Sequence, residues 1–120
     1  MSTARPASKL RETPALDRWP ELRSFVRDVA AEYGDRLEAI LLYGSRARGE
    51  ERDESDYDLA VVLNGDFDTY EQIGRLADLA YDHWLDDDVH IQARPILYSE
   101  LANSKRPFLE NVRRDGVRLL

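Results

Sequence analysis

The sequence predicts a single α+β domain, and three observations support this prediction. The chain has 120 residues, which is a usual size for one domain. Short apolar runs alternate with stretches of helical periodicity, in the order helix, strand, strand, helix, strand, helix and a final edge strand. Turn signals at Gly44-Ser45 and Asn64-Gly65 separate some of these runs. Residues 1–18 carry prolines and charges without apolar periodicity, so we expect a disordered tail there and a domain at residues 19–120.

The composition indicates a globular protein with an ionised surface. Hydrophobic residues make up 42% of the chain and charged residues 34%, and the net charge is −7. No apolar run approaches the ~20 residues of a membrane span, the N-terminus lacks the apolar core of a signal peptide, and the chain has no cysteine. We therefore expect a cytoplasmic protein that does not bind membranes. The acidic surface argues against direct nucleic-acid binding, but it suits a basic protein partner or a nucleotide held through a metal.

The first two elements are expected to be a helix and a buried strand. Pro20 suits the first turn of a helix, because its missing N–H needs no partner there. Gly34 is expected to end this helix as a left-handed cap. The apolar run within residues 37–43 is short and stops at Gly44, which predicts a strand buried on both faces. The helix has one apolar face, formed by Leu22, Phe25, Val26, Val29, Ala30 and Tyr33.

A second buried strand and a second helix follow. Residues 56–63 end in a continuous apolar run, which predicts the strand. Thr69 and Gln72 resemble a capping box and predict a helix over residues 69–85, although the preceding Asn-Gly turn could instead close a hairpin. His83 falls outside the predicted apolar face of this helix, so we expect it at the surface. This predicted apolar face consists of Ile73, Leu76, Ala77, Ala80 and Trp84.

The chain is expected to close with a third strand, a helical segment and an edge strand. Residues 89–97 predict the third strand. Ser99 is a candidate cap for a short helix, which Pro107 interrupts and restarts. Residues 117–120 predict the edge strand. The side chains expected to face inward from the restarted helix are Phe108, Leu109 and Val112.

Two aspartates at the head of the second predicted strand form a candidate metal site. Asp56 and Asp58 stand one residue apart, and side chains at i and i+2 of a strand project to the same face. Two neighbouring carboxylates suit Mg²⁺, a hard cation that prefers oxygen ligands. Paired metal ions at such a site stabilise the attacking and leaving oxygens of phosphoryl or nucleotidyl transfer.

The turn after the first predicted strand forms a candidate phosphate site. Gly44 lets the backbone approach a ligand closely, and the N–H groups around Ser45 can form an anion-binding concavity to which its hydroxyl adds a donor. Arg46 and Arg48 are placed to reach phosphates. Either half alone is common in proteins without catalytic function. The combination of turn and carboxylates at this spacing indicates a nucleotide-handling site.

This combination resembles the signature of a known superfamily. The string GSRARGEERDESDYDL resembles the motif of the DNA polymerase β-like nucleotidyltransferases, in which Asp-X-Asp follows Gly-Ser. The small size is similar to that of the minimal nucleotidyltransferase (MNT) group, and the resemblance spans residues 21–118 approximately. It implies a small mixed sheet flanked by helices, Mg²⁺, and transfer of a nucleoside monophosphate from ATP or another nucleoside triphosphate. It also implies a partner, a HEPN-domain ribonuclease toxin, which antitoxins of this group bind and adenylylate on a tyrosine.

The resemblance assigns most of the site and leaves one position open. By position it implies that Gly44 and Ser45 bind the triphosphate and that Asp56 and Asp58 hold the metals. The family's third carboxylate lies on the third strand, where the alignment places His90, with Asp88 two residues earlier on the same face. His90 as base, Asp88 as substitute carboxylate and metal ligand, and a site with reduced or no activity all stay open. In the alternative without function, the imidazole lines a polar face and the carboxylate is solvated in a turn.

Three hypotheses follow. The leading hypothesis is a Mg²⁺-dependent nucleotidyltransferase that acts as an antitoxin by adenylylating a HEPN-type toxin. The second is a catalytically degenerate binding module that neutralises its partner by contact alone. The third is transfer to a small-molecule acceptor, for which so short a chain would have to dimerise. Both homo-oligomers and hetero-oligomers are compatible with the sequence.

Overall fold

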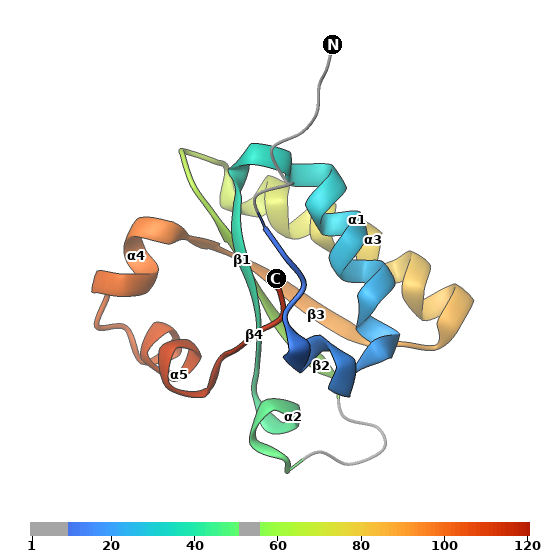
Figure 1. Cartoon of the computed structure of the whole chain (residues 1–120). Coiled ribbons are helices and arrows are strands. Elements are labelled where there is room, and N and C mark those ends of the chain that lie inside the picture. Colours follow the sequence, from blue (N-terminus) through green and yellow to red (C-terminus); the bar gives the residue numbers. More distant parts are fainter. Residues whose placement is uncertain (1–9, 51–55) are drawn as a thin grey trace.

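The computed structural model describes residues 10–50 and 56–120, which build a four-stranded sheet (Figure 1). The strands are β1 (Leu37–Tyr43), β2 (Tyr57–Leu63), β3 (Ile91–Leu97) and β4 (Val117–Arg118), and their order in the sheet is β3-β2-β1-β4. β1 is antiparallel to both β2 and β4, whereas β2 and β3 are parallel. The sheet is therefore mixed, and the prediction of a small α+β domain is confirmed.

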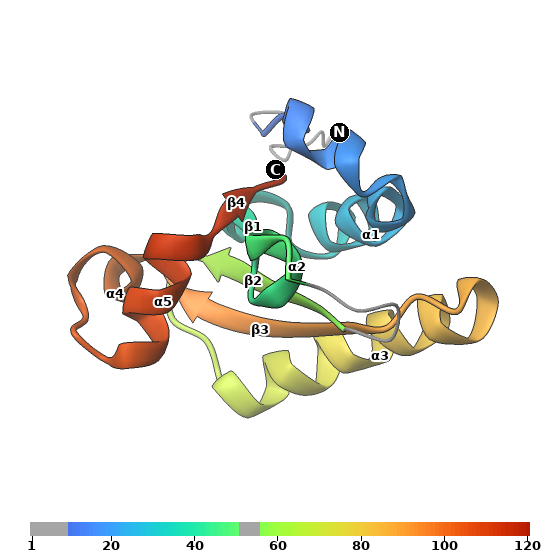
Figure 2. The ribbon, with the colours of Figure 1, turned by 90° about the horizontal axis from the view of Figure 1, so that it is seen from below.

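Helices lie on both faces of this sheet. They are α1 (Arg23–Tyr33), α2 (Ser45–Arg48), α3 (Thr69–Asp87), α4 (Tyr98–Asn103) and α5 (Pro107–Asp115), with 3₁₀ turns η2 (Pro14–Arg18), η3 (Pro20–Leu22) and η4 (Gly34–Arg36). α1 and α3 lie on one side of the sheet, and α4 and α5 lie on the other (Figure 1 and Figure 2). α3 forms the crossover that a parallel β2–β3 pair requires, so the hairpin alternative is wrong.

Alternate residues of β2 build the core on the two faces. Leu59, Val61 and Leu63 are fully buried in the larger cluster, which includes α1 and α3. Ala60 faces the other way and packs in a smaller cluster with residues of β3 and α5, namely Ile96, Leu109 and Val112. β2 is thus buried on both faces, as predicted. In β1, by contrast, four of the seven residues are only partly buried, so the same prediction is only partly correct for that strand.

The segment before α1 belongs to the domain. Leu16 in η2 is fully buried in the larger core cluster, and Trp19 is nearly so. The Thr13 N–H donates to the Leu119 carbonyl at 3.0 Å, so this segment lies against the C-terminal end of the chain. The prediction of a disordered tail is therefore wrong for residues 10–18. A single buried leucine leaves no periodic signal in the sequence, and residues 1–9 lie outside the described residues.

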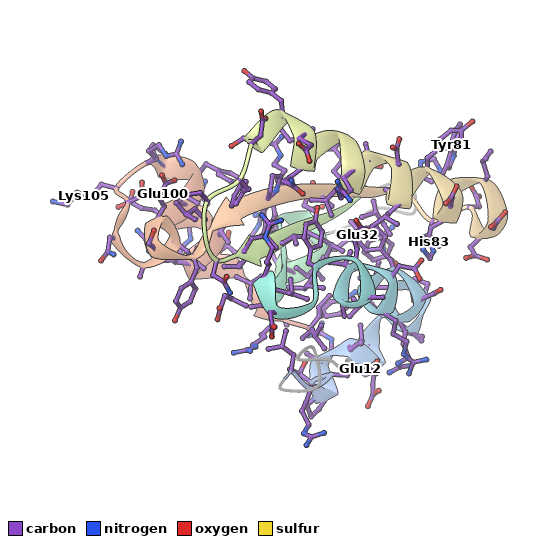
Figure 3. The ribbon with its side chains drawn as sticks, turned by 90° about the horizontal axis from the view of Figure 1, so that it is seen from above. Glu12, Glu32, Tyr81, His83, Glu100 and Lys105 are labelled. Carbon is purple, nitrogen blue, oxygen red and sulfur yellow. The ribbon has the colours of Figure 1, made fainter. Side chains whose placement is uncertain are left out.

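Helix ends and two polar side chains of α3 differ from the predictions. Asp68, not Thr69, caps α3, because its carboxylate accepts the Glu71 N–H at 3.1 Å. Gln72 is buried instead and accepts the hydroxyl of Tyr33 at 2.8 Å. His83 is also buried, with Nε2 2.8 Å from an Asp28 carboxylate oxygen on α1. Figure 3 shows His83 on the side of α3 that faces α1, and Tyr81 on the opposite side. These polar residues join the two helices.

The remaining boundaries are close to the predicted ones. Ser99 lies inside α4, which begins at Tyr98 without a side-chain cap, and Pro107 occupies the first turn of α5 as predicted. β3 starts two residues later than predicted, and β4 is two residues shorter. Gly34 has the expected positive φ of 52°, but its ψ of −124° lies outside the left-handed helical region. Within residues 10–50 and 56–120, no helix has the length and apolarity needed to span a membrane.

Candidate active site

Both halves of the sequence motif meet at one end of the sheet. Because β1 is antiparallel to β2 and β2 is parallel to β3, the end of β1 lies beside the starts of the other two strands. The sheet register places Asp58 opposite Tyr43 on β1 and opposite Gln92 on β3. α2, which begins at Ser45, lies at this end of the sheet, in front when the ribbon is seen from below (Figure 2). The structure therefore brings the Gly-Ser turn and the aspartates together.

Gly44 and Asp58 approach so closely that a side chain at position 44 would displace the Asp58 carboxylate. Gly44 has a φ of +79°, which L side chains rarely adopt. A Cβ built on it would lie 2.5 Å from the Asp58 Oδ2 atom. Glycine is therefore required both by the conformation of the turn and by the carboxylate beside it. This contact joins the predicted phosphate-binding turn to the predicted metal ligands.

The two carboxylates form an electrostatically unfavourable pair in the absence of a cation. Burial raises the pKa of Asp58, and the nearby Asp56 carboxylate raises it further, whereas Arg94 and Arg48 oppose the rise. A cation bound between the carboxylates would reverse this effect. Among the described residues, no group of three or more His, Asp or Glu side chains could hold a metal. Two carboxylates nevertheless fit Mg²⁺, which often binds through one or two carboxylates together with substrate phosphates and water.

An amide occupies the β3 position opposite the aspartates. Gln92 pairs with Asp58 in the parallel ladder, and its Nε2 donates to the Asp56 Oδ2 atom at 3.3 Å. Sequence reasoning missed this residue, although it shares strand parity with His90 and lies two positions further on. A glutamine can hold a carboxylate in place, but it brings no negative charge for a metal.

His90 and Asp88 lie just before β3 and are bonded to each other. The His90 Nε2 atom is 3.1 Å from the Asp88 Oδ1 atom, and its ring packs edge-on against Trp84 with centroids 5.8 Å apart. Asp88 caps α3 in the left-handed conformation, and its side chain is 90% exposed. His90 and Asp56 together line a shallow depression of about 250 Å³. The structure thus places His90 and Asp56 in one depression, which Asp88 does not line.

The two arginines of α2 contact protein groups. The guanidinium of Arg46 lies 4.0 Å from the ring centroid of Tyr57, on the α1 side of the sheet. Arg48 forms ion pairs with Glu50 at 3.0 Å and with Asp115 of α5 at 3.3 Å. For either arginine to reach a phosphate, as the sequence predicts, these contacts would have to change.

Arg94 is a cation of the site that the sequence analysis did not single out. It follows Gln92 by two residues on β3 and therefore shares its face of the sheet. Its charge opposes the raised pKa of Asp58, and its guanidinium lies 5.4 Å from the ring centroid of Phe108. Burial raises the pKa of Tyr43 to about 12, so this phenol stays neutral. The only sequence signal for Arg94 was its strand parity.

A groove runs along β3. It has a volume of about 1030 Å³ and is lined by every residue of β3, by the first half of α3 and by α4 and α5. In the described part of the chain no strand pairs with the outer edge of β3. Gln92 and Arg94 both line this groove, whereas neither aspartate does, and Gln92 connects the groove to the site through its hydrogen bond to Asp56.

Comparisons with known proteins agree with this geometry. The family model described as Polymerase beta, Nucleotidyltransferase matches residues 26–120, which include both halves of the motif. One relative, a protein of Methanocaldococcus jannaschii named as a candidate protein adenylyltransferase, is 28% identical over 96 residues, covering 80% of this chain and 92% of the relative. A second protein of that organism, also named as a candidate protein adenylyltransferase, is 40% identical over 47 residues, covering 39% of this chain and 47% of that relative.

Solved structures share the fold. A candidate nucleotidyltransferase from Sulfolobus solfataricus superposes with a TM-score of 0.60 at 20% identity, covering 98% of this chain and 89% of that one. A toxin–antitoxin structure with AMP-PNP gives a TM-score of 0.57 at 20% identity, covering 81% and 71%. The complex of a tri-AMPylated HEPN toxin of Shewanella oneidensis with its MNT antitoxin gives 0.50 at 18% identity, covering 81% and 67%.

Proposed function

The chain belongs to the Polymerase beta nucleotidyltransferase family, as its motif predicts, and on that premise we propose that it is a Mg²⁺-dependent protein adenylyltransferase. The observation that carries this proposal is the close approach of Gly44 to Asp58, which brings the predicted phosphate-binding turn next to the carboxylate pair. The names of two relatives support a protein as the acceptor of the nucleotide. The site would use ATP and transfer AMP.

Most residues of the site would bind the metal or the nucleotide. Asp56 and Asp58 would hold Mg²⁺, which supplies charge neutralisation and orientation for the triphosphate. Ser45 and the backbone N–H groups of the turn would bind phosphate oxygens, because Gly44 allows a ligand to approach the backbone. Arg94 adds a positive charge on the same face. Arg46 and Arg48 would join them only after leaving Tyr57 and Asp115.

Transfer requires a base for the acceptor hydroxyl. The hydroxyl oxygen forms a bond to the α-phosphorus, the bond from that phosphorus to the oxygen bridging to the β-phosphate breaks, and pyrophosphate leaves with the electron pair. The hydroxyl proton would pass to His90, which shares a depression with Asp56 and is oriented by Asp88. Gln92 cannot accept this proton and would position Asp56 instead.

The partner would be a HEPN-type ribonuclease toxin, so that the protein acts as an antitoxin. The support is the fold that the chain shares with antitoxins in toxin–antitoxin structures, one of which holds a tri-AMPylated HEPN toxin. At identities near 20% this likeness concerns the fold, and the acceptor tyrosine is part of the proposal. Such a partner also suits the net charge of −7, because a ribonuclease must bind phosphates.

A second candidate function is neutralisation of the partner by contact alone. It is favoured by Gln92, which places an amide opposite Asp58, and by the protein contacts that hold both arginines of α2. In that case the site would keep its shape without transferring a nucleotide.

The experiment is a transfer assay with α-labelled ATP, Mg²⁺ and the protein encoded by the neighbouring gene. We expect label on that protein with the wild-type chain, and a rate reduced by a factor on the order of 10³ in the Asp56→Asn/Asp58→Asn variant. Asp35→Asn, an exposed carboxylate near the opposite end of the sheet, is the matched control and should leave the rate unchanged. Tight partner binding without label would favour the contact-only function.

A further inference from the structure

The outer side of α3 carries a row of exposed apolar side chains. Among the described residues, six large apolar side chains are exposed, and five of them lie on α3: Tyr70, Ile73, Tyr81, Trp84 and Leu85. Tyr70 is 86% exposed, although a buried tyrosine would be more usual. Together with Ala77, these residues recur at intervals of three and four, so they form one continuous row along the helix. We call these six residues the α3 stripe.

The α3 stripe borders the candidate active site. Ile73 and Ala77 line the groove along β3, and Ala77 also lines the smaller depression with Tyr81 and Trp84. Asp56 and His90 line the same depression, and the His90 ring packs against Trp84. A protein bound along the stripe would therefore have part of its surface beside Asp56.

Acidic side chains flank the α3 stripe. Asp78, Asp82 and Asp86 recur every four residues on the side of α3 next to the stripe, and all three are exposed. The one basic residue of α3, Arg75, is engaged in ion pairs with Glu32 and Glu71. A partner surface complementary to this helix would thus be apolar in its centre and basic at its margin.

We propose that the α3 stripe is the docking surface for the acceptor protein, through an amphipathic helix whose apolar face is flanked by Lys and Arg. A helix is the shape that matches a straight apolar row along the 19 residues of α3, which extend about 28 Å. A second copy of this chain is disfavoured, because an antiparallel pair of α3 helices would bring their aspartate rows together and a parallel pair would leave both rows without a basic counterpart. That the bound protein is the acceptor rests on the proposed function. That the surface binds a basic amphipathic helix does not depend on it.

The test uses synthetic helical peptides of about 20 residues, a length that matches α3, and the full chain. The first peptide has a leucine face flanked by lysines, the second replaces the lysines with glutamates, and the third has the composition of the first in scrambled order. Binding is followed by tryptophan fluorescence and by amide chemical shifts. Trp84 is 45% exposed and Trp19 only 6%, so a blue shift on binding reports Trp84.

We expect the lysine peptide alone to bind, with shifts concentrated at the α3 stripe and an affinity that falls as salt is added. Tyr81→Ser with Ile73→Ser should weaken binding about tenfold or more. Tyr98→Ser is the matched control, because Tyr98 is equally exposed on α4, and it should bind as the wild type does. Equal binding of the glutamate peptide, shifts elsewhere on the surface, no binding, or a dimer formed through α3 would each overturn the proposal.

The docking surface and the transfer activity can fail separately. Asp56→Asn/Asp58→Asn should bind the lysine peptide like the wild-type chain, because neither aspartate belongs to the stripe. Peptide binding without any nucleotide transfer would leave the docking surface standing and remove the proposed function. If the Tyr81→Ser/Ile73→Ser variant transferred the nucleotide to the neighbouring protein at the wild-type rate, the proposed function would stand and the docking surface would be removed.

Discussion

The two faces of the sheet serve different purposes, although the same strands supply both. On the face toward α1 and α3, the odd-numbered residues of β2 are buried in the main core. On the other face, α5 covers Ala60, while Asp58 lies only partly buried at the end where Gly44 and Gln92 meet it. The strand thus supplies core side chains to both faces, and at its start one face also carries Asp58, a carboxylate that is unfavourable for stability. Substitutions in the core and at the carboxylate should therefore have different effects.

The largest expected effect on stability is on the core face. Leu59→Ala removes a fully buried side chain and should lower the free energy of unfolding by roughly 2–5 kcal/mol. Urea denaturation would measure this change. Leu85→Ala, on the exposed side of α3, is the control and should stay within about 0.5 kcal/mol of the wild type. A comparable loss for both variants would contradict the assignment of the core.

A smaller loss of stability, combined with loss of function, is expected at Gly44. Gly44→Ala places a Cβ against Asp58 and forces alanine into a positive φ, which should cost roughly 1–3 kcal/mol. The same change should abolish Mg²⁺-dependent nucleotide binding, because it displaces the carboxylate. Gly74→Ala is the control: it has open space around it inside α3 and should be neutral or stabilising. A Gly44→Ala variant that binds nucleotide normally would argue against the contact as the centre of the site.

The amide at position 92 can be changed to a carboxylate of nearly the same size. Gln92→Glu adds a third carboxylate next to Asp56, and we expect Mg²⁺ affinity to rise about tenfold because it depends on ligand charge. Without Mg²⁺ the added negative charge should lower the melting temperature. Gln92→Ala distinguishes charge from positioning, since it should weaken Mg²⁺ binding modestly. If Gln92→Glu left Mg²⁺ affinity unchanged, Gln92 would not adjoin the metal position.

The smallest expected effect is on the pH dependence of stability. The raised pKa of Asp58 means that the folded protein binds a proton more tightly than the unfolded chain. This contribution to stability is fully present below the pKa of an unfolded aspartate and is lost as the pH rises through the raised value in the folded state. Asp58→Asn should therefore be at least as stable as the wild type at neutral pH without Mg²⁺. Thermal unfolding from acidic to neutral pH would measure the difference, and a less stable variant at neutral pH would contradict it.

The sequence predicted the part of the site that local patterns encode. Gly44, Asp56 and Asp58 could be found because a strand end, a turn and a strand start follow one another within the chain. The family predicted from these residues is confirmed, because the nucleotidyltransferase family model matches residues 26–120. The continuous apolar run at the end of residues 56–63 also predicted correctly that β2 is buried on both faces.

The parts that were missed depend on contacts between distant segments. The position of Gln92 opposite Asp58 is set by the register of β2 and β3, which are joined through α3. Gln72 and His83 were misplaced because their partners, Tyr33 and Asp28, lie on α1. Leu16 joins the core from a segment with no periodic pattern. Such partners leave no mark at short range in the sequence.

Calorimetric titration of the chain with AMP-PNP, in the presence and absence of Mg²⁺, tests whether Gly44 and Asp58 belong to a metal–nucleotide site. If Gly44 and Asp58 form the centre of a metal–nucleotide site, the wild-type chain will bind the nucleotide only with Mg²⁺, and Asp58→Asn will not bind it under either condition. Binding that is independent of Mg²⁺, or equal in the wild type and Asp58→Asn, would contradict the account.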